Sequence, residues 1–292
     1  MTPFESRRGH TSSFSHLKQR QRIAIGRLAS LSGLFLVCLN LRIGYAQEPA
    51  SDKAAYARAV EYCRGSVTRP IALSDDKRTL CFDGWITPNQ DISLVEGLAE
   101  NGLFIVRSFG GAIATAIALA NLLRDKHAVV VVYDYCNSAC AGYLFIASAQ
   151  TYVVRDTIVA WHPWVSGLPD CSQMKVSDDG GPKSLEKWPC PDVPLEQQAG
   201  YQQVRALHEK FYTERTVDRK FKFPPQSFHV RKVLKNMLDG TGTYPDVAWM
   251  WNPRFYKNVL KTKVSYEAYP ESQDEVDEIA ARFHFRRMIF DP

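Results

Sequence analysis

The chain has 292 residues, of which 45% are hydrophobic, so it is long enough to bury the core of one large domain or two small ones. Of its 36 basic and 31 acidic residues, seven and one lie within the first 46 residues, so 29 and 30 remain. The formal charge of +5 therefore belongs to the beginning of the chain. The rest is near neutral, which excludes a broad basic face for nucleic acid.

The beginning of the chain has the layout of a secretory signal. A basic stretch precedes the apolar run 28–41, which is too short to span a membrane comfortably, and small residues at Gly44 and Ala46 follow it. This pattern predicts cleavage after Ala46 and a periplasmic or secreted protein without residues 1–46. An uncleaved membrane anchor over about residues 23–43 is the alternative, because the basic stretch is unusually long.

Six cysteines follow this leader, and an even number favours disulfide bonds in an exported protein. Pairing in sequence order predicts three bonds: Cys63–Cys81, Cys136–Cys140 and Cys171–Cys190. Six cysteines allow 15 connectivities, so other pairings stay open. Zinc is the alternative for the second pair, but no histidine lies at finger spacing, and we expect neither a metal nor a cofactor.

The predicted elements alternate between strands and helices in the first half of the chain. Residues 47–75 form a polar N-terminal extension with one helix, and the main domain covers 76–260. Strands are predicted at 79–87, 103–108, 127–135 and 157–164, with helices at 91–102, 112–126 and 139–149 between them. The third strand is continuously hydrophobic, as a parallel strand covered on both faces is. This order predicts an α/β fold with a mostly parallel sheet.

The second half of the chain departs from this alternation. Residues 163–196 are rich in Pro, Gly, Ser and Asp, which predicts a long loop tied at its neck by Cys171–Cys190 and suited to act as a lid. Helical periodicity returns at 195–218 and 226–238, where His208 and His229 are interpreted as structural. Residues 261–292 form a helical tail whose acids precede its bases, as a helix dipole favours.

Three successive strand ends carry groups that suit acyl-transfer chemistry. Gly110–Gly111 forms a turn after the second predicted strand, Ser138 follows the third, and His162 lies at the end of the fourth, 24 residues after the serine. Carboxyl ends of parallel strands lie along one sheet edge, so we expect these residues to converge. Serine needs an adjacent base to become a nucleophile, and the N–H groups of Gly111 and Ala139 could form an oxyanion hole.

The segments 106–123, 129–150 and 156–164 resemble the signature segments of the Clp-type serine peptidases in the ClpP/crotonase superfamily. The likeness is greatest to exported ClpP-like proteins with a Cys-x-Ser-Ala-Cys nucleophile turn, and it covers about residues 78–255. It implies a ClpP/crotonase-like fold of repeated β-α-β units. It also implies that Ser138 is the nucleophile and His162 the general base, with oxyanion donors at Gly111 and Ala139.

Two positions depart from the family pattern. The resemblance places the acid of the site at Asp246, one residue out of register, with Asp239 as the runner-up. Cys140 stands where the family has a glycine shortly after the serine. A Cys136–Cys140 disulfide would staple this turn and hold Ser138 without the large oligomer that cytosolic relatives form.

Three functions are compatible with these features. The first is an exported serine hydrolase, a peptidase acting on a peptide or protein substrate without an ATPase partner. The second is a non-enzymatic binding or structural protein on the same fold, in which Ser138 only caps a helix and His162 is a core residue. The third, an acyl-CoA enzyme, is disfavoured because CoA is not expected outside the cytoplasm. Homo-oligomerisation stays open, and membrane contact is expected only if the leader is not cleaved.

Overall fold

The computed structural model describes residues 50–66, 70–162, 172–176, 182–187, 199–222, 225, 227, 229, 230, 232, 248–285 and 288–292. The helices and short helical turns are α1 Ala50–Ser66, η1 Ser93–Gly97, α2 Ile113–Asp125, η2 Cys140–Leu144, α3 Ala199–Glu214, η4 Arg219–Lys222, η6 Pro253–Phe255, α5 Tyr256–Val259 and α6 Gln273–Arg282. The strands are β1 Ile71–Leu73, β2 Thr79–Ile86, β3 Leu103–Gly111, β4 Val129–Asn137, β5 Gln150–Val153, β6 Ile158–Ala160, β7 Ser172–Val176, β8 Pro182–Lys187, β9 Ala248–Trp249, β10 Lys263–Tyr266 and β11 Met288–Ile289. The predicted leader lies outside the described residues.

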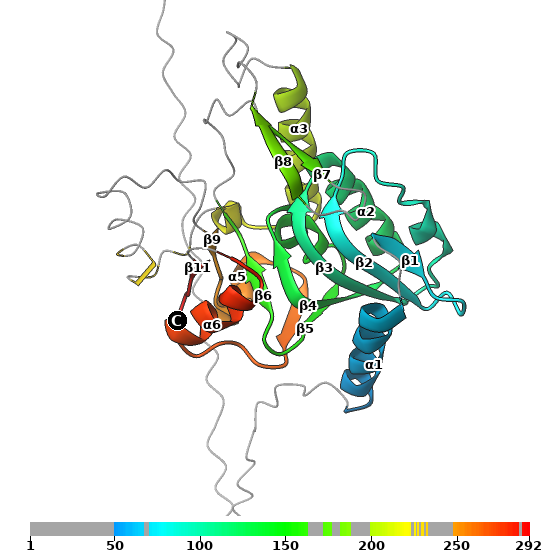
Figure 1. Cartoon of the computed structure of the whole chain (residues 1–292), viewed down its shortest axis with the longest axis horizontal. Helices are drawn as coiled ribbons and strands as arrows, with labels where there is room; N and C mark the ends of the chain where they lie inside the picture. Colours follow the sequence, from blue (N-terminus) through cyan, green and yellow to red (C-terminus); the bar gives the residue numbers. More distant parts are fainter. Residues whose placement is uncertain are drawn as a thin grey trace, which may run out of the picture. The chain divides into compact units, whose positions relative to one another are not determined.

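A seven-stranded sheet forms the centre of the described structure (Figure 1). Its strands follow the order β1-β2-β3-β4-β5-β10, and β6 pairs with β4 off this path. β1 is antiparallel to β2, whereas the pairs of β2 with β3, β3 with β4, β4 with β5 or β6, and β5 with β10 are parallel. The predicted α/β class with a mostly parallel sheet is therefore confirmed.

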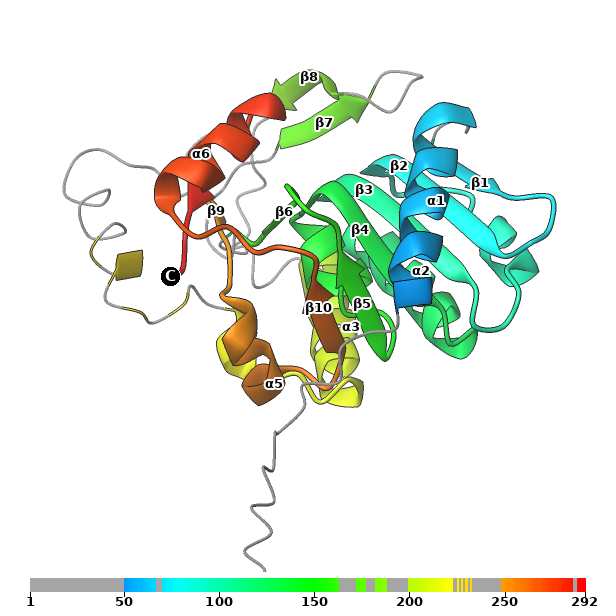
Figure 2. The same ribbon diagram turned by 90° about the horizontal axis from the view of Figure 1, so that it is seen from below.

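Both faces of the sheet are covered, which explains the continuous valine run of β4. Val130 and Val132 belong to the core on the α2 side, whereas Val131 and Tyr133 belong to a second core that includes α1 residues. Figure 2 shows these two helices on opposite faces of the sheet. Since side chains alternate along a strand, one continuous apolar strand serves two cores.

The two covering helices present apolar stripes at helical spacing. Both stripes follow the positions i, i+3, i+4 and i+7 and are buried: Tyr56, Ala59, Val60 and Cys63 in α1, and Ala116, Leu119, Ala120 and Leu123 in α2. The predicted Cys63–Cys81 disulfide is present and joins α1 to β2. An ion pair between Arg64 and Asp134 fastens the same helix to β4.

A bulge in β4 directs the end of this strand towards β6. Between the pairs Val106–Val132 and Ser108–Cys136, β3 advances by two residues and β4 by four, and Asp134 within this step has φ of +58°. Bulges bend a strand and are common beside active sites. As a result, the first half of β4 pairs with β5 and its last three residues pair with β6.

The structure corrects several sequence predictions. The helix predicted at 91–102 is a single 3₁₀ turn, η1, and the helix predicted at 139–149 is the five-residue π-helix η2. β1, β5 and β10 were not predicted, because runs of three or four residues show too little periodicity. The loop predicted at 163–196 contains an antiparallel pair, β7 and β8.

The C-terminal helix agrees with its prediction. α6 begins after the N-cap Ser272, whose side chain accepts from the Glu275 N–H, and its acids precede its bases. Its buried residues pack with β6, β9 and β11 in a third core. Within the described part of the chain, no helix is long and apolar enough to cross a membrane.

Candidate active site

Ser138 occupies a sharp turn directly after β4. Its φ of +57° lies in the left-handed region, which few residues other than glycine adopt and which persists only where the surroundings hold it. The Ser138 N–H donates to the Ala160 carbonyl at 3.1 Å, and its own carbonyl accepts from the Gly142 N–H at 2.8 Å. Strand β6 on one side and the following turn on the other thus fix this backbone.

The predicted Cys136–Cys140 disulfide is present and brackets this turn. It links the end of β4 to the first residue of η2, and both cysteines are fully buried. Beyond it, the Phe145 N–H donates to the Cys140 carbonyl at 2.9 Å, five residues back in the chain. Such π-type turns occur frequently at functional sites. The covalent link therefore restrains the two ends of the segment that carries Ser138.

The glycine pair at the end of β3 allows a close approach to this turn. Gly110 has φ of +91°, and a Cβ atom there would lie 2.5 Å from the Asn137 carbonyl oxygen and 2.7 Å from the Ser138 Cβ. Only a residue without a side chain fits between the two strands at this point. The turn predicted at Gly110–Gly111 is thus the end of a strand that packs directly on the serine turn.

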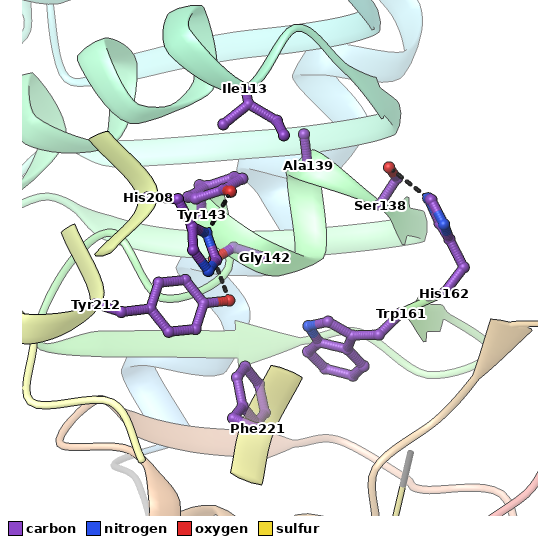
Figure 3. A pocket seen from close by; sticks show the side chains of 10 residues that line it. All are labelled: Ile113, Ser138, Ala139, Gly142, Tyr143, Trp161, His162, His208, Tyr212 and Phe221. Carbon is purple, nitrogen blue, oxygen red and sulfur yellow. Dashed lines mark hydrogen bonds between the residues drawn. The ribbon is translucent and has the colours of Figure 1, made fainter. Parts of the chain in front are cut away.

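Ser138 and His162 are in hydrogen-bonding contact. The Ser138 Oγ lies 2.7 Å from the His162 Nε2, as Figure 3 shows. The register of β4 with β6, in which Asn137 pairs with Ala160, brings the two residues together just beyond the strand ends. Ala139, not Ser138, is the N-cap of η2, and the Ser138 hydroxyl faces the imidazole.

Backbone pairing also positions His162 from the other side. Trp161 and Trp249 exchange two backbone hydrogen bonds, of 2.9 and 2.7 Å. Trp249 is fully buried and belongs to β9, which pairs with β11 near the C-terminus. The residue before the histidine is therefore anchored by a segment about 90 residues further along the chain, which local sequence patterns do not reveal.

Two backbone N–H groups lie beside the serine turn. The Ala112 N–H donates to the Ile86 carbonyl at 2.8 Å. Gly111, the residue before it, has φ of +137°, which is outside regular strand geometry. The N–H of Ala139 is at the start of η2, where N–H groups have no intrahelical acceptor. A Cβ on Gly110 would lie 2.7 Å from the Ala139 nitrogen, so the two predicted donor segments are adjacent.

A small cavity of about 90 Å³ opens beside the serine. It is lined by Ile113, Ser138, Ala139, Gly142, Tyr143, Trp161, His162, His208, Tyr212 and Phe221 (Figure 3). The surface that lines the cavity is mainly apolar. Tyr143, His208 and Tyr212 form the wall opposite Ser138 and His162. Its walls come from the start of α2, the turn after β4, η2, α3, η4 and the residues after β6.

The far wall of this cavity is a buried polar cluster. The Tyr143 hydroxyl lies 2.7 Å from the His208 Nδ1, and the Tyr212 hydroxyl donates to the Gly142 carbonyl at 3.3 Å. Burial raises the pKa of both tyrosines, so their hydroxyls stay neutral. Sequence reasoning missed this cluster, although His208 and Tyr212 share one face of α3 at i, i+4 spacing.

No protein-family model matches the sequence, and no curated protein matches it either. Functional argument therefore depends on the geometry of the described residues.

Several predicted residues lie outside the described part of the chain. They are the two candidate acids, Asp246 and Asp239, and the cysteines of the third predicted disulfide, Cys171 and Cys190. Among the residues that the structure does describe, no group of three His, Cys, Asp or Glu side chains could hold a metal ion. The described site thus consists of a serine, a histidine, adjacent backbone N–H groups and a small cavity with one polar wall.

Proposed function

We propose that the protein is an exported serine hydrolase of the ClpP-like type and that it acts as a peptidase. The observation that carries this proposal is the 2.7 Å contact between the Ser138 Oγ and the His162 Nε2. A serine hydroxyl is a weak nucleophile unless a base takes its proton, and this contact provides one. The left-handed turn and the disulfide around it support a role in which the position of the hydroxyl matters.

In the proposed reaction, the Ser138 Oγ attacks the carbonyl carbon of the substrate while the His162 Nε2 takes the hydroxyl proton. The electron pair of the carbonyl π bond moves onto the oxygen, which gives a tetrahedral intermediate with an oxyanion. Collapse of this intermediate breaks the C–N bond, and His162 returns the proton to the leaving amine. Water, deprotonated by the same imidazole, then hydrolyses the acyl-enzyme and restores the free serine.

The N–H groups of Gly111 and Ala139 are the proposed oxyanion donors. Both belong to segments that meet at Gly110, and the Ala139 N–H lies at the start of η2, where N–H groups have no intrahelical acceptor. Fixed donors of this kind contribute about 3–4 kcal/mol each to transition-state stabilisation in serine proteases. Asp246 is proposed to orient His162, with Asp239 as the alternative.

The ClpP/crotonase-like fold belongs to the same proposal. In support, strands β2, β3 and β4 are parallel and sequential. The glycine pair ends β3, and the serine turn and the histidine follow β4 and β6. Export is proposed from the leader-like beginning of the sequence, and the two disulfides suit an oxidising compartment. Membrane attachment is proposed only for an uncleaved leader.

A fluorophosphonate probe tests the proposal directly, because it reacts with activated serines. The wild-type protein with intact disulfides is expected to label, and Ser138→Ala to abolish labelling. His162→Ala should slow labelling by about 10²–10⁴-fold, the usual contribution of a general base. As a matched control, His127→Ala removes an imidazole that follows α2, away from the cavity, and should label like wild type. Failure of the wild-type protein to label or to cleave any ester or peptide would favour a binding protein instead.

A further inference from the structure

The cavity beside Ser138 has a size and a lining that restrict the kind of side chain it can admit. Its volume is about 90 Å³. A water molecule occupies ~30 Å³, so this space holds about three non-hydrogen atoms, whereas a cavity that binds benzene measures about 150 Å³. Among the described residues that line the cavity, none is an Asp, Glu, Lys or Arg. The cavity therefore suits a short, uncharged group and is too small for an aromatic ring.

The polar groups of the cavity wall are directed at one another rather than at a ligand. The Tyr143 hydroxyl pairs with the His208 Nδ1, and the Tyr212 hydroxyl donates to the Gly142 carbonyl. The His208 Nε2 is buried, so a ligand does not reach it. The surface that remains for a ligand is mainly apolar. A charged side chain would lose its water there without gaining an ion pair, which is unfavourable.

The position of His162 indicates which part of a substrate would enter the cavity. In the proposed reaction, His162 returns the proton to the leaving amine, so the leaving part of the substrate lies beside the imidazole. In Figure 3, Ser138 lies between His162 and the wall that includes Tyr143 and Tyr212. The cavity thus extends from Ser138 on the side away from the leaving group. The side chain that enters it belongs to the residue that supplies the scissile carbonyl.

Gly142 leaves part of this space open. It lines the cavity, and its φ lies outside the left-handed region, so an alanine there would be unstrained. Among the described residues beyond its own turn, a Cβ atom on Gly142 would meet only the Tyr212 hydroxyl within 4 Å. That distance would be 3.7 Å, which is an ordinary contact. A side chain at this position would therefore extend towards the wall of the cavity and occupy part of it.

We propose that this cavity selects peptides in which the residue that supplies the scissile carbonyl has a small aliphatic side chain, alanine or valine. The inference rests on the proposed hydrolase function and adds a substrate class to it. The methyl group of alanine and the three-carbon branch of valine fit a space of about 90 Å³. A phenylalanine ring needs a cavity of the size that holds benzene. A lysine side chain would bring a charge for which the described lining has no partner.

The test uses peptidyl diphenyl phosphonates that end in the phosphonate analogues of alanine, valine, phenylalanine and lysine. The Ser138 Oγ bonds to phosphorus, and one phenoxide leaves and takes up the hydroxyl proton. The labelling rate therefore reports how well each side chain is accommodated. The alanine and valine probes should label the wild-type protein about 10²-fold faster than the other two, because a single methylene group in a pocket is worth about 10–200-fold.

Two variants should move this preference in opposite directions. Gly142→Ala adds a methyl group to the wall and should lower the ratio of valine to alanine labelling by about 10–200-fold. Ile113→Ala shortens a half-buried lining side chain and should raise the ratio of phenylalanine to alanine labelling by about tenfold or more. Ile92→Ala is the matched control, because Ile92 packs against the same core but does not line the cavity, and its ratios should equal those of wild type. Ratios are compared because a loss of folded protein lowers both rates together.

Equal labelling by the alanine and phenylalanine probes, or ratios that neither variant changes, would overturn the proposal, while fluorophosphonate labelling would still support the hydrolase. If no phosphonate labels, calorimetry on Ser138→Ala decides, with acetylated tripeptides that end in alanine or phenylalanine. Binding of the alanine peptide about tenfold tighter or more would support the cavity even if the hydrolase proposal failed. Equal affinity, or no binding of the alanine peptide, would overturn it.

Discussion

Replacing Gly110 by alanine tests whether the glycine pair positions the nucleophile. The added Cβ would lie 2.5 Å from the Asn137 carbonyl oxygen, 2.7 Å from the Ala139 nitrogen and 2.7 Å from the Ser138 Cβ. None of these atoms is the end of a flexible side chain, so the serine turn itself has to move. An alanine at the observed φ of +91° is also strained, by about 1–2 kcal/mol on the scale of left-handed residues.

The size of the displacement sets the expected loss of activity. Ordinary contacts of a Cβ begin near 3.4 Å, so relief requires a shift of roughly 0.7–0.9 Å in the serine turn. Misplacing a reacting group by about 1 Å can cost about 10²-fold in rate. Gly110→Ala should therefore slow fluorophosphonate labelling by about 10²-fold. Strands β3 and β4 are buried behind the turn and do not have to move. The variant should therefore still fold cooperatively.

Labelling rates and thermal melts of the same samples separate these effects. Gly65→Ala is the matched control, because a Cβ at Gly65 in α1 meets nothing within 4 Å. It should label like wild type and melt at the same temperature or higher, since alanine favours a helix. A folded Gly110→Ala variant that labels at the wild-type rate would show that this close approach does not position Ser138.

Further predictions concern the disulfides and the leader. Removing the Cys136–Cys140 bond by double alanine substitution should slow labelling more than it lowers stability, because a loop this short contributes less than the ~3 kcal/mol of a 15-residue loop. Removing Cys63–Cys81, with a sequence separation of 18, should do the reverse and lower the free energy of unfolding by about 3 kcal/mol while labelling persists. Mass spectrometry of exported protein should find a mature chain beginning at Gln47, whereas an N-terminus at Met1 would favour the anchor.

The long elements of the fold were predictable because their periodicity is strong. The stripes of α1 and α2 and the valine run of β4 each contain enough residues to identify a helix or a doubly covered strand. β5 and β10 have four residues each, and their membership in the sheet depends on tertiary pairing. The turn η2 was mistaken for a long helix because apolar content alone does not distinguish a π turn from a helix that continues.

The proximity of the serine and the histidine could be predicted because each follows a strand of a parallel sheet. The carboxyl ends of such strands lie at the same edge of the sheet. What spacing could not show is the bulge at Asp134, which directs β4 towards β6. The anchoring of Trp161 by Trp249 and the polar wall from α3 also escaped prediction. Both are contacts between residues far apart in the sequence, and they become visible only when the chain is folded.

Because of the Cys136–Cys140 bond, the turn at the site needs an oxidant to reach its final form, whereas the sheet does not. β4, β3 and their covering helices owe their burial to apolar side chains, which need no oxidant to pack. The turn that carries Ser138 is joined covalently only after two thiols have lost their protons and two electrons to an acceptor. In a freshly made chain in a reducing compartment, the turn that carries Ser138 would therefore lack its covalent restraint. The proposed hydrolase activity would then stay slower until an oxidant is present, which would reduce damage to the cell that makes the protein.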